Sequence, residues 1–189
     1  MQADPMTPEE RANRIGDKDT VRRILFWAVP HVPRAARMPL AQRHEQLRQL
    51  ADTAAAAIAP ETPCKKGCAA CCHQAVGIGW DDAQRIGAAI GRAPVRLTAL
   101  TDPRENIDRY AGKPCPFLVE NLCTVYDVRP LACRLHHSLE NDAAPCDSTT
   151  NPGARAGMLN LAPFYMAAAE LMMGEPAGDI REFFPREQP

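Results

Sequence analysis

Aromatic residues are scarce in this chain of 189 residues and make up only 5% of it. Long strands favour aromatic and β-branched side chains, so this scarcity argues against an extended sheet. Glycine is outnumbered by proline, 11 to 18, which indicates many short elements joined by rigid connections. We therefore expect a mainly α protein.

The chain also lacks a strong excess of either charge, because its formal net charge is −1 and its pI is near 6.5. A nucleic acid or an acidic membrane would require a basic face. We therefore expect neither a nucleic acid nor a membrane as a partner. Lysine is rare as well, and the 18 arginines against 4 lysines are typical of a GC-rich bacterial genome.

Targeting segments and common catalytic motifs are missing too. Residues 1–19 contain no apolar run, so we expect no secretory signal and a cytoplasmic protein. The most apolar stretch, 158–173, is interrupted by polar residues and is too short to cross a bilayer of about 30 Å. A glycine-rich phosphate loop, HExxH, GxSxG and a dinucleotide fingerprint are all absent. The sequence leaves open whether the protein is an enzyme.

Cysteine, in contrast, is abundant: eight residues form two clusters. Disulfides are rare in a reducing cytosol, whereas thiolates readily bind metals there. The first cluster holds four cysteines within nine residues, at a spacing that brings the sulfurs together in either a helix or a tight turn. We predict that all eight are metal ligands: Cys64, Cys68, Cys71, Cys72, Cys115, Cys123, Cys133 and Cys146.

The metal is restricted by the all-sulfur donor set, which selects zinc, copper(I) or iron–sulfur clusters over magnesium, calcium or manganese. A tetrahedral zinc usually takes two C-x2-C pairs, and only Cys68 and Cys71 have that spacing. The adjacent side chains of Cys71 and Cys72 point apart, which favours a cluster or two neighbouring metals. We therefore favour an iron–sulfur cluster, of the [4Fe–4S] type, over zinc. Eight cysteines suffice for one such cluster with a separate zinc, or for two four-thiolate sites.

Helical patterns flank the cysteines. A long helix is expected from about Pro39 to Ile58, where apolar residues recur at helical spacing. A second is expected to start with Asp81-Asp82 as its cap and to stop at Gly91. Between Cys115 and Tyr126, two apolar runs on either side of Glu120-Asn121 predict a β-hairpin.

These patterns predict three segments. Residues 1–60 form a helical N-terminal arm, and residues 61–150 form a cysteine-cluster metal-binding domain. Residues 151–189 form a C-terminal helix and a frayed tail, packed on the same unit. The expected fold is mainly α, with a small irregular cysteine-rich metal core that contains one β-hairpin.

Three motifs together resemble the YkgJ-type cysteine-cluster family of zinc- or iron-chelating domains. They are C-x3-C-x2-C-C, K-P-C-P-F-L and N-L-C-T-V-Y-D-V-R-P-L-A-C-R, and they extend from Pro63 to His137. Members include bacterial flagellin lysine N-methylases, which are thought to carry an iron–sulfur cluster. The resemblance implies metal binding and, more remotely, an enzyme or accessory factor that acts on a protein or peptide. The alternative is a structural zinc module that mediates protein–protein interaction.

The positions of the cysteines allow them to be ranked. If both clusters surround one shared centre, Cys68, Cys71, Cys115 and Cys133 should be the least dispensable. Cys146 should be the most dispensable, because it stands alone in a polar loop where ordering the backbone costs about 1–2 kcal/mol per residue. Nearby imidazoles can supply a nitrogen ligand or a hydrogen bond to sulfur: His73, His136 and His137.

Overall fold

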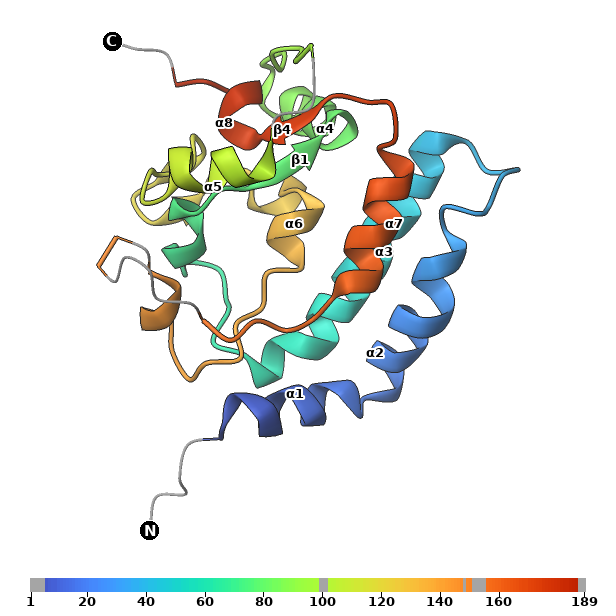
Figure 1. Cartoon of the computed structure of the whole chain (residues 1–189), viewed down its shortest axis with the longest axis vertical. Helices are drawn as coiled ribbons and strands as arrows, with labels where there is room; N and C mark the ends of the chain where they lie inside the picture. Colours follow the sequence, from blue (N-terminus) through green and yellow to red (C-terminus); the bar gives the residue numbers. More distant parts are fainter. Residues whose placement is uncertain (1–5, 99–101, 148, 151–155, 187–189) are drawn as a thin grey trace.

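A computed structural model of the chain describes residues 6–98, 102–147, 149–150 and 156–186. This part contains eight α-helices and two antiparallel sheets of two short strands each, so the prediction of a mainly α protein is confirmed (Figure 1). No helix in this part of the chain is long and apolar enough to cross a membrane.

Four helices form one side of the molecule: α1 (Pro8–Gly16), α2 (Asp19–Arg23), α3 (Leu40–Ile58) and α7 (Ala162–Leu171). The first begins with a capping box, in which the Thr7 hydroxyl accepts from the Glu10 amide and the Glu10 carboxylate accepts from the Thr7 amide. After α2 the chain continues through a π-helical turn, η1 (Ile24–Ala28), and a 3-10 turn, η2 (Val29–His31). The long helix α3 lies within one residue of its predicted bounds.

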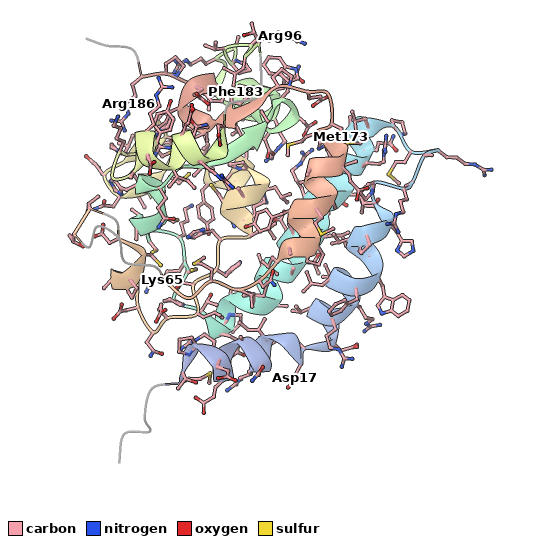
Figure 2. The ribbon with its side chains drawn as sticks, in the orientation of Figure 1. Asp17, Lys65, Arg96, Met173, Phe183 and Arg186 are labelled. Carbon is pink, nitrogen blue, oxygen red and sulfur yellow. The ribbon has the colours of Figure 1, made fainter. Side chains whose placement is uncertain are left out.

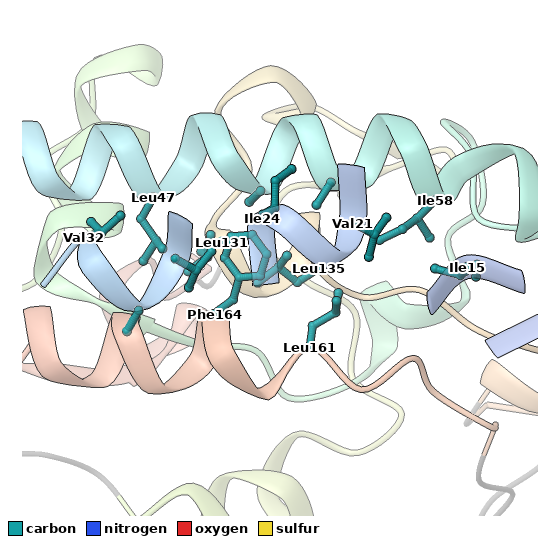
Figure 3. Close-up of a cluster of buried hydrophobic side chains, with 14 of the residues drawn as sticks. Ile15, Val21, Ile24, Val32, Leu47, Ile58, Leu131, Leu135, Leu161 and Phe164 are labelled. Carbon is teal, nitrogen blue, oxygen red and sulfur yellow. The ribbon is translucent and has the colours of Figure 1, made fainter. Parts of the chain in front are cut away.

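Apolar side chains fill the space between these helices (Figure 3). Phe164 of α7 is completely buried among residues of α1, α2 and α3. Leu131 of α6 (Leu131–Arg134) and Leu135 just beyond it also join this cluster. The short helix α6 therefore ties the cysteine-bearing half of the chain to the helical half.

A second group of elements packs together. It consists of β1 (Gly77–Gly79), α4 (Trp80–Ile90), α5 (Pro103–Tyr110), β4 (Ala177–Asp179) and α8 (Ile180–Phe183). β1 pairs with β4, which comes about 100 residues later in the chain. Ile180, Phe183 and Phe184 lie in the apolar cluster of this region. β4 and α8 thus fix the chain up to Phe183, whereas the predicted frayed end, 185–189, lies mostly outside the described residues.

The start of α4 differs from the prediction. Gly79 is the N-cap, and no side chain caps the helix. Asp82 instead accepts a hydrogen bond from the amide of Leu131, at 3.3 Å, and so links α4 to the start of α6. The predicted aspartate cap is wrong because a tertiary contact engages the carboxylate. The predicted end is correct, since Gly91 adopts a left-handed conformation with φ 67°.

The expected hairpin is formed by β2 (Leu118–Val119) and β3 (Leu122–Cys123). Both turn residues are left-handed, Glu120 at φ 48° and Asn121 at φ 62°, as a tight two-residue turn requires. The prediction of one hairpin in the cysteine-rich region is confirmed. Three short helical turns complete this region: η4 (Ala70–His73), η5 (Tyr126–Val128) and η6 (Ala144–Cys146).

Candidate metal centre

A cavity of about 350 Å³ lies among α3, the first cysteine cluster, the hairpin and α6. Cysteines from both clusters line it: Cys64, Cys68, Cys71, Cys72, Cys115, Cys123 and Cys133. None of the eight cysteines forms a disulfide. The structure thus brings seven of the eight predicted ligands to a single cavity.

The first cluster is shaped by a tight turn followed by a 3-10 turn. Gly67 adopts φ 91°, which a residue with a Cβ rarely does, and the amide of Cys68 donates to the carbonyl of Lys65 at 3.0 Å. The next turn, η4, carries Cys71 and Cys72. This local fold turns the sulfurs of the cluster toward the cavity rather than along one helix face.

The second cluster is joined to the first through the backbone. The amide of Cys115 donates to the carbonyl of Cys72 at 2.7 Å, so these two cysteines are held side by side. Cys123 lies in the second hairpin strand, opposite Leu118, and Cys133 lies in α6. Three separate elements therefore bring thiols of the second cluster to Cys72.

Cys146 does not line the cavity, but it is not isolated. Its residue is only 6% exposed, and its carbonyl accepts a hydrogen bond from the Gln74 side chain at 2.9 Å. The Ser138 hydroxyl hydrogen-bonds to the Cys146 thiol, while the Ser138 amide donates to the sulfur of Cys64 at 3.3 Å. The expectation that Cys146 stands alone in a polar loop is wrong, because packing against the first cluster buries it.

The thiols differ in their acidity. Burial raises the pKa of Cys115 to about 11 and also raises that of Cys133. The pKa of Cys72 is lowered to about 7, first by a hydrogen bond with Cys71 and then by the charge of Arg181. The pKa of its partner Cys71 is raised correspondingly. The hydrogen bond with Cys71 thus favours the thiolate of Cys72, the form in which a cysteine binds a metal.

Arg181 of α8 holds the backbone around Cys72. Its guanidinium donates to the carbonyls of Lys113 at 2.6 Å and Gln74 at 3.1 Å. It also pairs with Asp179, a completely buried carboxylate that in turn accepts from the amide of Val76 at 2.6 Å. Sequence reasoning missed this pair, although the D-x-x-E pattern from Asp179 is a capping-box signal.

The two adjacent histidines have different surroundings. His137 is engaged by protein atoms, with Nε2 at 3.1 Å from the carbonyl of Arg134. Burial lowers its pKa to about 4 and also lowers that of His136. The Nε2 of His136 is buried and has no hydrogen-bond partner among the described residues, and His136 lines the cavity. Of these two histidines, His136 is the one with a nitrogen open to a metal group.

Cationic side chains, including Arg129 and Arg134, lie beside the cavity. Arg129 packs on the Tyr126 ring at 4.0 Å and Lys66 lies 5.4 Å from the same ring. Arg134, which is buried, forms an ion pair with Asp52 and donates to the carbonyl of Asp127 at 2.7 Å. These cations offset the negative charge that thiolates bring to the site.

The residues that line the cavity offer an all-sulfur donor set to a metal group. In the described part of the chain, no three Cys, His, Asp or Glu side chains are arranged to hold one metal ion. Four thiolates about 2.3 Å from one zinc would have to lie about 4 Å from one another. In a cluster each thiolate binds a different iron, so the sulfurs can stay farther apart.

A helical scaffold with a sulfur-lined cavity defines a cysteine-based metal-binding protein. Residues 63–151 match the model of the CxxCxxCC family, described as "Putative zinc- or iron-chelating domain". The predicted resemblance to a cysteine-cluster family is therefore confirmed over this cysteine-bearing segment. Neither a curated protein nor a solved structure matches the chain. Arg181 and Asp179 lie outside the matched residues.

Proposed function

We propose that the protein holds an iron–sulfur cluster of the [4Fe–4S] type through its cysteine thiolates. The observation that carries this proposal is the cavity of about 350 Å³, which seven cysteines line without converging on a single-ion site. The family description, zinc- or iron-chelating, supports metal binding through these cysteines. The chemistry of an all-sulfur site narrows the choice to iron–sulfur or zinc.

Several residues of the protein favour the binding of such a cluster. The hydrogen bond with Cys71 favours the thiolate of Cys72, and Arg181 fixes the loop of Cys72 while adding positive charge. The cations beside the cavity balance the charge of the remaining thiolates. Buried apolar residues, including Phe117 and Val125, pack behind the hairpin and exclude water. When bound, an iron–sulfur cluster supplies electron-transfer chemistry at a potential set by these charges and by burial.

Anaerobic purification provides the test. We expect a brown protein with a broad absorption band near 400 nm, and with iron and acid-labile sulfide in about equal amounts. The Cys115→Ser variant should lose part or all of that absorption, because a hydroxyl binds iron poorly. A colourless protein with stoichiometric zinc, and no iron after reconstitution, would overturn the proposal.

The second candidate is a structural zinc module that binds a partner protein. Two large apolar side chains of η1 favour it, because Phe26 is 68% and Trp27 is 72% exposed. Exposed apolar residues of this size are common at interaction surfaces. The metal analysis above separates the two candidates. Two further points stay predictions. Action on a protein or peptide rests on the resemblance, and a cytoplasmic location rests on the composition.

A further inference from the structure

We propose that the protein binds a small organic cation, of the primary ammonium type, in a second cavity away from the cysteines. This cavity has a volume of about 90 Å³ and lies among α3, β1, α4, α6 and α7. Met172, at the end of α7 and next to the labelled Met173 in Figure 2, is part of its wall. Among the described residues, none lines both this cavity and the cysteine-lined one. The proposal therefore goes beyond metal binding and does not depend on it.

A buried imidazole nitrogen of the cavity wall lacks a partner. His44 of α3 is only 8% exposed, and its Nε2 is buried with no hydrogen-bond partner among the described residues. The Nδ1 of the same ring faces the carboxylate of Asp81, with Oδ2 at 3.8 Å. In the neutral tautomer with the proton on Nδ1, beside this carboxylate, Nε2 is an acceptor. Because a buried acceptor without a partner costs free energy, a ligand that donates a hydrogen bond to Nε2 is favoured here.

The charges of the cavity wall favour a cation over an anion. Two carboxylates, those of Asp81 and Asp82, line the cavity together with one guanidinium, that of Arg48. Arg48 is already engaged, because it donates to Asp81 at 2.5 Å and pairs with Glu45 at 3.0 Å. An anion would thus face two carboxylates and an arginine that is already paired. An ammonium group, in contrast, donates hydrogen bonds to both carboxylate and imidazole.

The size of the cavity and its apolar wall limit this cation to a short alkylammonium ion. In the described ranges, no three Cys, His, Asp or Glu side chains are placed to hold a metal ion, so the cation is an organic one. Leu47, Ile78 and Met172 provide apolar surface for an aliphatic part. A cavity of about 150 Å³ holds benzene, so one of about 90 Å³ fits about four non-hydrogen atoms. Ethylammonium meets these requirements and serves as the probe.

Saturation-transfer NMR with ethylammonium chloride and the full-length protein provides the test. We expect transfer to the methyl protons and a Kd between about 1 and 10 mM, because so small a ligand makes few contacts. Acetate has a similar size and the opposite charge, whereas tetramethylammonium has the same charge and no N–H donor. Both should bind at least tenfold more weakly. These two controls distinguish the cavity from general attraction of cations to an acidic surface.

Substitutions in α7 locate the bound probe. Ala168 lines the cavity, whereas the next residue, Ala169, is exposed and does not line it. Ala168→Leu fills the cavity and should raise the Kd for ethylammonium at least tenfold. Ala169→Leu, the matched control, should leave the Kd unchanged. Circular dichroism of both variants checks that each retains the fold.

The imidazole nitrogen gives a second measurement, on the wild-type chain. Ethylammonium should shift the Nε2 signal of His44 in a long-range proton–nitrogen spectrum, and His44→Leu identifies this signal among those of the five histidines. Acetate should leave it in place. The proposal would be overturned by wild-type protein that binds no ethylammonium, by equal affinity for acetate, or by an unshifted His44 signal at saturation. An unchanged Kd in Ala168→Leu would equally exclude this cavity as the site.

Discussion

The helical region and the cysteine region of this protein are held together in different ways. In the helical region, formed by α1, α2, α3 and α7, fully buried apolar side chains fill the interior. Ile15, Val29 and Phe164 are among those with no exposed surface. In the cysteine region, the elements are short, and a smaller apolar cluster, which includes Phe117 and Phe184, lies beside the cysteine-lined cavity.

Hydrogen bonds from arginine to backbone carbonyls hold the loops of the cysteine region. Arg181 and Arg134 each bind two or more carbonyls of the cysteine region, and Arg85 binds those of Val128 and Arg129 at 2.9 Å. Such contacts fix loops but bury little apolar area, which is the main source of folding free energy. The comparison predicts that the cysteine region depends more strongly on a bound metal than the helical region does.

The largest expected effect is that of metal removal. Because cysteine sites rarely exist preformed, metal binding contributes directly to folding, and chelation should unfold residues 63–146 before the helices. Hydrogen exchange with and without chelator should show loss of protection in β2, β3 and α6, while α3 stays protected. An unchanged thermal transition after complete metal removal would contradict the expected dependence of the cysteine region on metal.

Removal of Arg181 should be the most harmful single substitution in the cysteine region. Arg181→Ala leaves Asp179 buried without its partner and frees the carbonyls of Gln74 and Lys113. We expect a loss of about 3–5 kcal/mol in the free energy of unfolding, together with reduced metal retention. Arg23→Ala, which breaks an exposed ion pair with Asp19, is the matched control and should cost less than about 1 kcal/mol. Full metal retention in Arg181→Ala would contradict the role given to this arginine.

Phe164→Ala should destabilise the helical region and leave the metal site unaffected. The cavity left in the helical cluster should cost about 3 kcal/mol or more, measured by urea unfolding. The metal content of the folded protein should stay unchanged, because Phe164 does not line the metal cavity. Met166→Ala, on the exposed face of the same helix, is the control and should change stability by less than about 0.5 kcal/mol.

A smaller effect should follow acidification. Burial lowers the pKa of His137 from 6.5 to about 4, so the unfolded chain takes up the proton more readily than the folded one. This contribution to stability is therefore complete above about pH 6.5 and is lost as the pH falls toward 4. We expect a loss of roughly 2 kcal/mol between pH 7.5 and pH 5, measured by urea unfolding. His137→Gln should flatten this dependence, and an equally steep curve in the variant would exclude His137 as its source.

The smallest effect should come from the capping box of α1. Thr7→Ala removes the hydroxyl that accepts from the Glu10 amide, at a cost of about 1 kcal/mol. Thr7→Ser keeps the hydroxyl and should restore most of that stability. Neither variant should alter metal content, and a loss of metal in Thr7→Ala alone would show that the two regions fold as one unit.

Local sequence signals determined much of this protein. Helical periodicity and flanking prolines were enough to locate the helix from Leu40 to Ile58. The Glu120-Asn121 pair specified the hairpin turn, since both residues tolerate positive φ there. The eight cysteines and their spacing indicated the resemblance to a cysteine-cluster family and the soft-metal chemistry, because the donor atoms are read directly from residue type.

Only the tertiary structure shows which cysteines lie close together and which residues contact them. Cys146 is buried because Ser138 and Gln74 bind it, and no local pattern around it shows that contact. The Asp81-Asp82 pair resembles a helix cap, yet Asp82 is engaged by the amide of Leu131. The strand β4 pairs with β1 across some 100 residues and places Arg181 against the Cys72 loop. Such long-range contacts depend on where the chain folds back, which short-range propensity and spacing do not encode.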